Sequence, residues 1–443
     1  MTHLIITDSP DWTFETIEKY EREIARIAAA SRLDIYPNQL EIISSEQMID
    51  AYSLVGLPVG YTHWSFGKQF LSTEQNYRKG HMGLAYEIVI NSDPCISYLM
   101  EENTATMQAL VIAHAAFGHN SFFKGNYLFR SWTKADAIID YLVFARDYVA
   151  QCESRHGELE VELLLDSCHA LINYGVDTCR QPHCRTADEE RARVLARLRY
   201  QEENFNDLWR TVPQETFDEG HPPEFVFPTD PQENILYFIE KNAPHMEPWK
   251  REIVRIVRKI AQYFHPQRQT KVMNEGWASF WHYTLINTLY DEGFLSNGQM
   301  MEFLQSHTNV IFQPGFDDPR YSGINPYALG FAMMSNIRRI CENRTDEDRS
   351  WFPSLANTDW LTSLDFAMGN FKDESFITQY LSPNLIRRFK LFSILDDDLE
   401  DHVAISAIHD EYGYLNIRNK LAEQYNIASV QPDIKVVGGQ PTR

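Results

Sequence analysis

The chain has 443 residues, enough for one large or two moderate domains, and 44% of them are hydrophobic, with 26 Phe, 22 Tyr and 9 Trp. This composition is that of a globular protein and excludes extensive disorder except at the ends. The 62 acidic residues outnumber the 40 basic ones and leave a formal charge of -22, which argues against nucleic acid and anionic membranes as partners.

The sequence also lacks the usual marks of export or membrane insertion. No apolar run approaches the roughly 18 residues of a spanning helix, so no membrane span is predicted. The opening MTHLIITDSPDW has neither a basic n-region nor an apolar h-region. Six cysteines in a chain of this length do not form a disulfide framework. These features predict a protein of the reducing cytoplasm.

The N-terminal part alternates helical and strand patterns. Apolar residues at helical spacing predict an amphipathic helix from Asp11 to Ser31, and a second helix covers Ser45 to Leu54. The segments Tyr61 to Phe70 and Tyr86 to Asn91 are rich in aromatic or β-branched residues and are predicted to form strands of one small sheet. With helical patterns almost everywhere else, the expected fold class is mainly α with a small β-sheet (α+β).

A helix carrying two histidines follows, beginning after Asn103 or Thr104 as its N-cap. His114 falls on the apolar face, and Gly118 on that face permits a close approach. His119 stands at i+5 from His114, about 140° around a regular helix, unlike the i, i+4 pair of an HExxH zinc helix. A single π-bulge would bring both rings to one side. The alternative is one satisfied core histidine and one capping or surface histidine.

The helix Glu158 to Tyr174 carries a second polar pair, Asp166 and His169, at i and i+3 on one face. Because Leu163, Leu165, Ala170 and Ile172 flank this face, we expect both side chains to lie in the same interior pocket as the histidines. The pair could be two metal ligands, an acid and its orienting group, or simply a hydrogen-bonded pair. Cys179 and Cys184 are interpreted as incidental, since their spacing is not that of a zinc clip.

Beyond this helix, the predicted domain organisation is simple. Residues 211–232 are Pro-rich and acidic and predict an exposed loop or linker. Asp396 to Asp398 are interpreted as a solvated turn. A single helical domain is expected over residues 1–425, and residues 426–443 form a C-terminal extension.

The stretch NEGWASFWHY, Asn274 to Tyr283, concentrates polar and aromatic side chains on one predicted helix. Glu275, Ser279 and His282 share a stripe. Glu275 and His282 are two turns apart, roughly 10 Å along the axis, so each needs a partner from another element. The alternative is a buried helix whose polar groups are hydrogen-bonded to backbone.

Together these segments resemble the arrangement of zinc peptidases of the gluzincin kind, in which a strand, a two-histidine helix and a distant glutamate helix converge. This zincin-like arrangement predicts a divalent metal site, zinc above other metals, with His114, His119 and Glu275 as ligands. No separate cofactor-binding motif is present.

One position departs from that pattern. Ala115 follows His114 where HExxH has its general base. The base would then be supplied by Asp166, His169 or His282, or the site is not hydrolytic.

Longer motifs carry a closer resemblance. HAAFGHNSFFKGNYLF, LLDSCHALINYGVD, QTKVMNEGWASFWHY and HTNVIFQPGFDDPRYSGINPYALGF resemble the stage V sporulation protein R (SpoVR) family over nearly the whole chain. The resemblance implies a link to spore cortex or cell-wall formation, and a genetic association with a serine protein kinase and a von Willebrand A-type protein. It also implies that the C-terminal region is longer in other members.

Two functional hypotheses follow. The first is a metal-dependent hydrolase acting on an amide or peptide bond, with the cell wall as a candidate source of the substrate. The second is a non-catalytic partner in a kinase-linked stress or sporulation complex, with the polar interior as a structural network.

Overall fold

The computed structural model describes residues 5–53, 59–66, 68, 71–72, 75, 87–177, 187–204, 231–355, 358–395, 404–406, 410–426, 432 and 434–437. The chain divides into two compact units. The first unit comprises Met1–Gln151 and Phe264–Gln431, and the second comprises Cys152–Tyr263 and Pro432–Arg443. The expected boundary between residues 425 and 426 stays a prediction.

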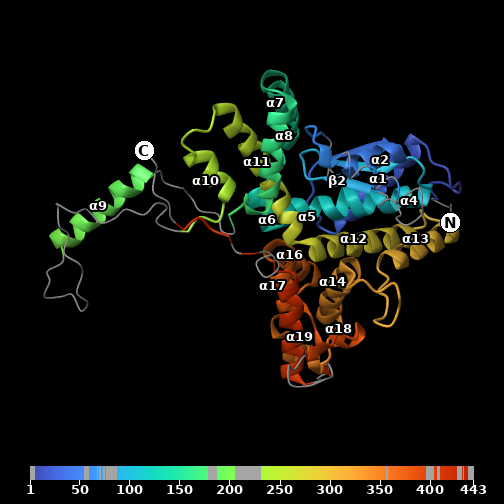
Figure 1. Ribbon diagram of the computed structural model, residues 1–443. Coiled ribbons are helices and arrows are strands. Elements are labelled where there is room, and N and C mark those ends of the chain that lie inside the picture. Colours follow the sequence, from blue (N-terminus) through green and yellow to red (C-terminus); the bar gives the residue numbers. More distant parts are fainter. Residues whose placement is uncertain are drawn as a thin grey trace. The chain divides into compact units, whose positions relative to one another are not determined.

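The described residues are mainly helical, as predicted (Figure 1). The helices that begin in the first unit are α1 Phe14–Ala30, α2 Ser45–Ser53, α4 Ala105–Val111, the π-helix η1 Ile112–His119, α5 Asn120–Gly125, α6 Tyr127–Trp132, α7 Ile138–His156, α12 Lys271–Asp291, α13 Asn297–Val310, α14 Pro326–Glu342, α15 Asp346–Trp351, η4 Pro353–Leu355, α16 Trp360–Asn370, α17 Asp373–Tyr380, α18 Pro383–Arg388 and α19 Glu411–Gln424. Those that begin in the second unit are α8 Glu158–Ala170, η2 Ile172–Tyr174, α9 Ala187–Asn204, α10 Ile235–Asn242 and α11 Pro248–Gln269.

A three-stranded sheet lies in the first unit, with strand order β1-β3-β2. β1 (Asn38–Ile43) is parallel to β3 (Cys95–Met100), and β2 (Glu87–Ile90) is antiparallel to β3. β2 is therefore an edge strand, and it confirms the strand expected at Tyr86 to Asn91. A second sheet consists of the short strands β4 (Ser393–Leu395) and β5 (Ala404–Ser406).

The prediction of a strand at Tyr61 to Phe70 is wrong for the residues of this segment that the structure describes, because residues 64–66 are helical and residues 61–63 have no regular structure. The His63 ring bonds Ser65 at 2.6 Å, a local contact that competes with strand pairing. The sheet partners are instead β1 and β3. β3 pairs with β2 because the chain turns back within four residues, Asn91 to Pro94.

The helix that follows β3 is buried along most of its length. Thr104 is its N-cap and accepts a hydrogen bond from Met107 N at 3.2 Å, which confirms one of the two expected caps. Residues 105–123 are all buried. At the end of η1, Asn120 N donates to Ala115 O, five residues back, which is the π-type bond.

α12 packs between this helix and α14 (Figure 1). Glycines make both contacts close. A Cβ added at Gly118 would lie 2.7 Å from Cα of Ala278, so Gly118 does permit the close approach expected of it. On another face of α12, a Cβ added at Gly276 would lie 2.4 Å from Cα of Gly330 on α14. Backbone meets backbone at both crossings, and α12 is fixed in position by them.

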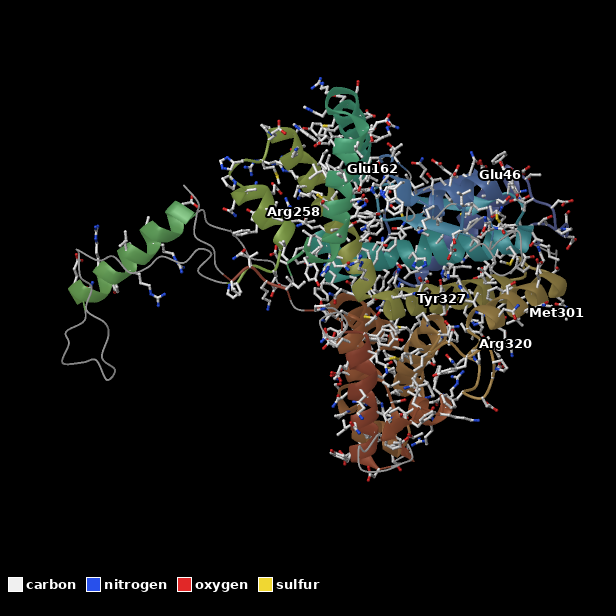
Figure 2. The ribbon with its side chains drawn as sticks, in the orientation of Figure 1. Glu46, Glu162, Arg258, Met301, Arg320 and Tyr327 are labelled. Atoms are coloured by element: carbon white, nitrogen blue, oxygen red, sulfur yellow. The ribbon has the colours of Figure 1, made fainter. Side chains whose placement is uncertain are left out.

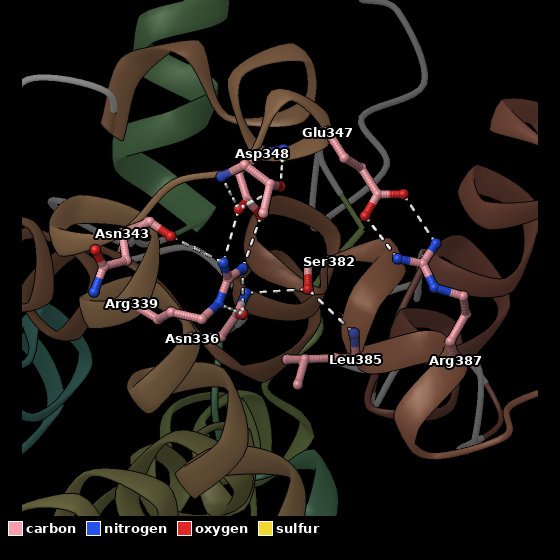
Figure 3. Close-up of polar contacts among 9 residues, drawn as sticks. Asn336, Arg339, Asn343, Glu347, Asp348, Ser382, Leu385 and Arg387 are labelled. Atoms are coloured by element: carbon pink, nitrogen blue, oxygen red, sulfur yellow. Dashed lines mark hydrogen bonds and ion pairs between the residues drawn. The ribbon is translucent and has the colours of Figure 1, made fainter.

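Charged side chains tie α14 to the helices that follow it (Figure 3). Arg339 bonds both carboxylate oxygens of Asp348, each at 2.8 Å, and Asp348 is 2% exposed. Asn336 of α14 also donates to Ser382 at the start of α18. A bidentate pair of this kind is geometrically specific, so α14 is held at its C-terminal end as well as at its crossing with α12.

The second unit has its own buried ionic contact, in which Glu240 of α10 bonds Arg255 and Arg258 of α11. Most of the Pro-rich segment 211–232, and the segments containing Cys179, Cys184 and Asp396 to Asp398, lie outside the described residues. Within the described residues, no helix combines the length and the apolar character that crossing a membrane requires.

Candidate metal centre

The π-helix brings His114 and His119 together. Their ring centroids are 4.7 Å apart with the planes nearly perpendicular. Residues five apart align when a turn is widened to the π form, whereas a regular α-helix would separate them by about 140°. The widened turn that the sequence left as one of two alternatives is therefore present, and it extends over the eight residues of η1.

Both histidines direct Nε2 toward two carboxylates. Glu275 Oε2 lies 3.9 Å from Nε2 of His114 and 3.5 Å from Nε2 of His119. Glu87 Oε1 lies 3.0 Å and 4.0 Å from the same two atoms. The ligand atoms of Glu87, His114 and His119 all lie within 4.8 Å of one another, a geometry that could hold a metal ion. The 3.5 Å separation of His119 and Glu275 agrees with the distance expected for two ligands of one ion.

The other ring nitrogen of each histidine has a hydrogen-bond partner. Nδ1 of His119 donates to Oδ1 of Asn274 at 2.9 Å, because an amide oxygen can only accept. Nδ1 of His114 lies 2.7 Å from Nδ1 of His282. A proton on Nδ1 leaves the lone pair on Nε2, and this is the tautomer that binds a metal through Nε2.

Each residue of the motif Gly118 to Ser121 has a separate contact. Gly118 meets α12, and His119 contacts Glu275 and Asn274. Asn120 accepts from Tyr36 N and donates to Tyr36 O, which ties the end of η1 to the segment before β1. Ser121 accepts from the indole N–H of Trp277 at 2.9 Å. The motif thus fixes the position of the two-histidine helix against both the segment before β1 and α12.

Glu87 is the site residue that the sequence did not identify. It lies at the start of the edge strand β2, in the predicted strand segment that precedes the histidines in the chain. The signal in the sequence was a carboxylate in a predicted strand ahead of a two-histidine helix. Nothing in the strand pattern, however, gives the register that points Glu87 at His114.

The charges of the site favour a cation. Burial alone would lower the pKa of His114, but the carboxylates of Glu87 and Glu275 outweigh burial and raise this pKa to about 10. Burial lowers the pKa of His119. Burial opposes ionisation of Glu275, yet the hydrogen bond and charge of His114 together with the charge of His119 lower its pKa. Without a metal, the two carboxylates therefore favour the protonated form of His114.

Two buried oxygens of the cluster have no hydrogen-bond partner among the described residues, namely Oε2 of Glu87 and Oε2 of Glu275. A buried, unpaired carboxylate oxygen is costly unless a cation or donor occupies the space beside it. Two imidazoles and two carboxylates are a donor set that suits zinc, and it suits manganese or ferrous iron as well. The residues present thus fit a divalent ion.

A tyrosine completes this cluster. Tyr327 is near the start of α14, beside α12 (Figure 2), and its side chain hydrogen-bonds Glu275. Its ring is nearly parallel to that of His114, with centroids 6.5 Å apart. Asn325 caps α14 by accepting from Tyr327 N at 3.0 Å, so the loop before α14 determines where the phenol lies.

The chain was compared with known protein families, with curated proteins and with solved structures. The family model described as SpoVR like protein matches residues 11–430. The chain belongs to the SpoVR family. It is similar to the uncharacterized protein YcgB of Escherichia coli (strain K12), with 59% identity over 431 residues, covering 97% of this chain and 84% of that protein. No solved structure matches. The resemblance read from the sequence motifs is thus confirmed.

The three residues predicted to be catalytic occupy different places. His282 is buried on α12 and contacts His114. Asp166 and His169 lie on α8 in the second unit and are half-buried. α8 is not apolar on all sides, because Leu163 is 55% exposed. Catalytic roles for Asp166, His169 and His282 stay predictions.

Proposed function

We propose that this SpoVR-family protein is a metal-dependent hydrolase whose divalent ion, zinc above others, is bound by His114, His119 and Glu275. The observation that carries the proposal is the convergence of two imidazole Nε2 atoms on two carboxylates, each of which has a buried oxygen without a hydrogen bond among the described residues. Ionisable groups are costly to bury without a partner, and a bound cation would satisfy all of them.

The distances favour Glu275 over Glu87 as the third ligand. Atoms bound to one tetrahedral zinc at about 2.0 to 2.1 Å lie roughly 3.3 to 3.5 Å apart. Glu275 Oε2 is placed evenly, 3.9 and 3.5 Å from the two histidine nitrogens. Glu87 Oε1 is 3.0 Å from one and 4.0 Å from the other. Three ligands with one open position are the arrangement of catalytic rather than structural zinc.

Glu87 is then available as the general base that Ala115 cannot provide. A carboxylate beside the open position can accept a proton from the attacking water and pass it to the leaving group. A divalent ion would supply Lewis-acid polarisation and lower the pKa of water. The phenol of Tyr327 can donate a hydrogen bond to the oxyanion that forms on the substrate.

The substrate class that we propose is an amide or peptide bond, with the cell wall as the candidate source. The support is the order of elements: a strand that leads into the two-histidine helix, an edge strand beside it, and a distant helix with Asn274 and Glu275. This order resembles that of zinc peptidases of the gluzincin kind.

The test is elemental analysis of protein purified without a histidine tag, together with assays of the hydrolysis of fluorescence-quenched peptide substrates and of peptidoglycan fragments. We expect about one zinc per chain in the wild type and a steep loss in Glu275→Gln, which keeps volume but not charge. Glu87→Gln should retain the ion and lose hydrolysis. Glu342→Gln is the matched control, because Glu342 forms an exposed pair with Arg338.

The outcomes separate the competing hypotheses. Loss of the ion in Glu87→Gln as well would make Glu87 a ligand rather than the base. Unchanged metal content in a folded Glu275→Gln variant would contradict the proposed ligand set. Wild-type protein without metal, whose melting temperature does not respond to chelator, would favour the alternative of a non-catalytic partner in a kinase-linked complex.

A further inference from the structure

A chain of three histidines runs from the candidate metal centre into the interior. Nδ1 of His114 lies 2.7 Å from Nδ1 of His282, and Nε2 of His282 lies 2.7 Å from Nδ1 of His307 on α13. The three side chains are 3%, 1% and 4% exposed, respectively. Each contact is short enough to be a hydrogen bond, so the rings form one continuous path across three helices.

The direction of these hydrogen bonds follows from the first ring. If Nε2 of His114 binds an ion, its proton must be on Nδ1, and Nδ1 donates to His282. Nδ1 of a neutral His282 then accepts, so its proton is on Nε2 and is donated to Nδ1 of His307. His307 in turn has its proton on Nε2. One ligand bond thus determines the tautomer of all three rings.

Aromatic side chains hold the far end of the path. Phe303 is stacked with the ring of His307 at 5.8 Å, and Tyr283 and Phe331 lie 4.8 and 4.9 Å away. Phe303 also packs edge-on against His282. These apolar walls favour the bond between the two imidazoles, because competing water is kept away.

We propose that His282 and His307 are positioning residues, which hold His114 with its Nε2 lone pair directed at the ion. This inference rests on the proposed metal-binding function. His282 touches a ligand rather than the ion or the reacting atoms, which is how a carboxylate or carbonyl commonly orients a metal-binding histidine. Here the orienting group is a neutral imidazole, itself oriented by His307.

The decisive comparison is between two variants at one position. His282→Gln retains an acceptor for the Nδ1 proton of His114, whereas His282→Leu has similar volume and no acceptor. Loss of such a partner typically weakens metal binding by about 10- to 100-fold. We expect zinc affinity, measured by competition with a fluorescent chelator, to fall by that factor in His282→Leu and to be largely restored in His282→Gln. The d–d absorption of the cobalt-substituted protein should shift in His282→Leu alone.

A second measurement does not depend on the stability of those variants. In wild-type protein labelled with ¹⁵N-histidine and loaded with zinc, His282 and His307 should both be Nε2–H tautomers, assigned through His282→Gln and His307→Gln. An Nδ1–H tautomer at His282 would overturn the inference. So would wild-type zinc affinity and an unchanged cobalt spectrum in a folded His282→Leu.

Failure of the proposed function has a different signature. If Glu275→Gln binds zinc as tightly as the wild type, the ligand set is wrong and the inference falls with it. If Glu275→Gln loses zinc while His282→Leu does not, the metal site stands and only the positioning role is refuted.

Discussion

Gly118→Ala tests whether the crossing of η1 and α12 determines the geometry of the candidate metal centre. The new Cβ would lie 2.7 Å from Cα and 2.9 Å from Cβ of Ala278. Ordinary van der Waals contact begins at 3.4 Å, so the two helices must separate by about 0.7 Å. Neither atom of Ala278 belongs to a flexible side chain, so the backbone itself must move.

The magnitude follows from two opposing effects. Overpacking of a well-packed core costs about 1 to 3 kcal/mol. Alanine gains up to about 1 kcal/mol over glycine in a helix interior. With the full gain from alanine, we therefore expect the free energy of unfolding to fall by up to about 2 kcal/mol. His119 adjoins Gly118, and Glu275 is one turn from Ala278, so a separation of the two helices also separates these two side chains. A separation of about 0.7 Å exceeds the roughly 0.5 Å tolerance of a preorganised site, and zinc affinity should therefore fall as well.

The assay is urea denaturation followed by tryptophan fluorescence, because Trp277 and Trp281 are fully buried on α12. Gly298→Ala is the control, since the nearest atom to its Cβ is Oγ of Ser296 at 3.9 Å. This variant should be stabilised by up to about 1 kcal/mol, the helix-propensity effect alone. A Gly118→Ala protein that is as stable as Gly298→Ala and binds zinc normally would refute the close crossing as the determinant of the site.

Two further predictions concern the supports of α12. Asp373 accepts hydrogen bonds from two backbone N–H groups at the start of α12, and burial raises its pKa to about 7, against 3.8 for an exposed aspartate. The contribution of this raised pKa to stability is therefore complete below about pH 4 and is lost as the pH rises through 7. In excess chelator, the free energy of unfolding of the wild type should fall by up to about 4 kcal/mol relative to that of Asp373→Asn between pH 4 and 8. Parallel pH profiles of the two proteins would contradict the raised pKa. Ser121→Ala leaves the buried indole N–H of Trp277 without its acceptor and should cost about 1 to 3 kcal/mol by urea denaturation. Ser167→Ala is the control, because it removes an exposed hydroxyl bonded within its own helix, and it should change stability by less than about 0.5 kcal/mol. Equal effects of the two serine variants would count against the buried hydrogen bond between Ser121 and Trp277.

Much of the helical structure could be predicted from the sequence because helix formation depends on residues within one or two turns. The helix of His114, its cap at Thr104 and the helix of Glu275 all follow from spacing and capping. The sequence left the π-helix as one of two alternatives, since two histidines five apart share a side only if a turn is widened. The β-sheet was predictable only in part. Strand pairing joins segments far apart in sequence, such as Asn38 with Cys95.

The candidate site shows the same division. Which elements bear His114, His119 and Glu275 can be read from the sequence, because helical periodicity and costly buried groups are local features. That Glu87 joins them depends on the register of an edge strand, and a slip of one residue would point Glu87 to the other face. The path from His282 to His307 and the phenol of Tyr327 depend on how α12 packs against α13 and α14. Such convergence joins side chains as far as 168 residues apart in the chain, as between His114 and His282, and only tertiary packing brings them within hydrogen-bonding distance.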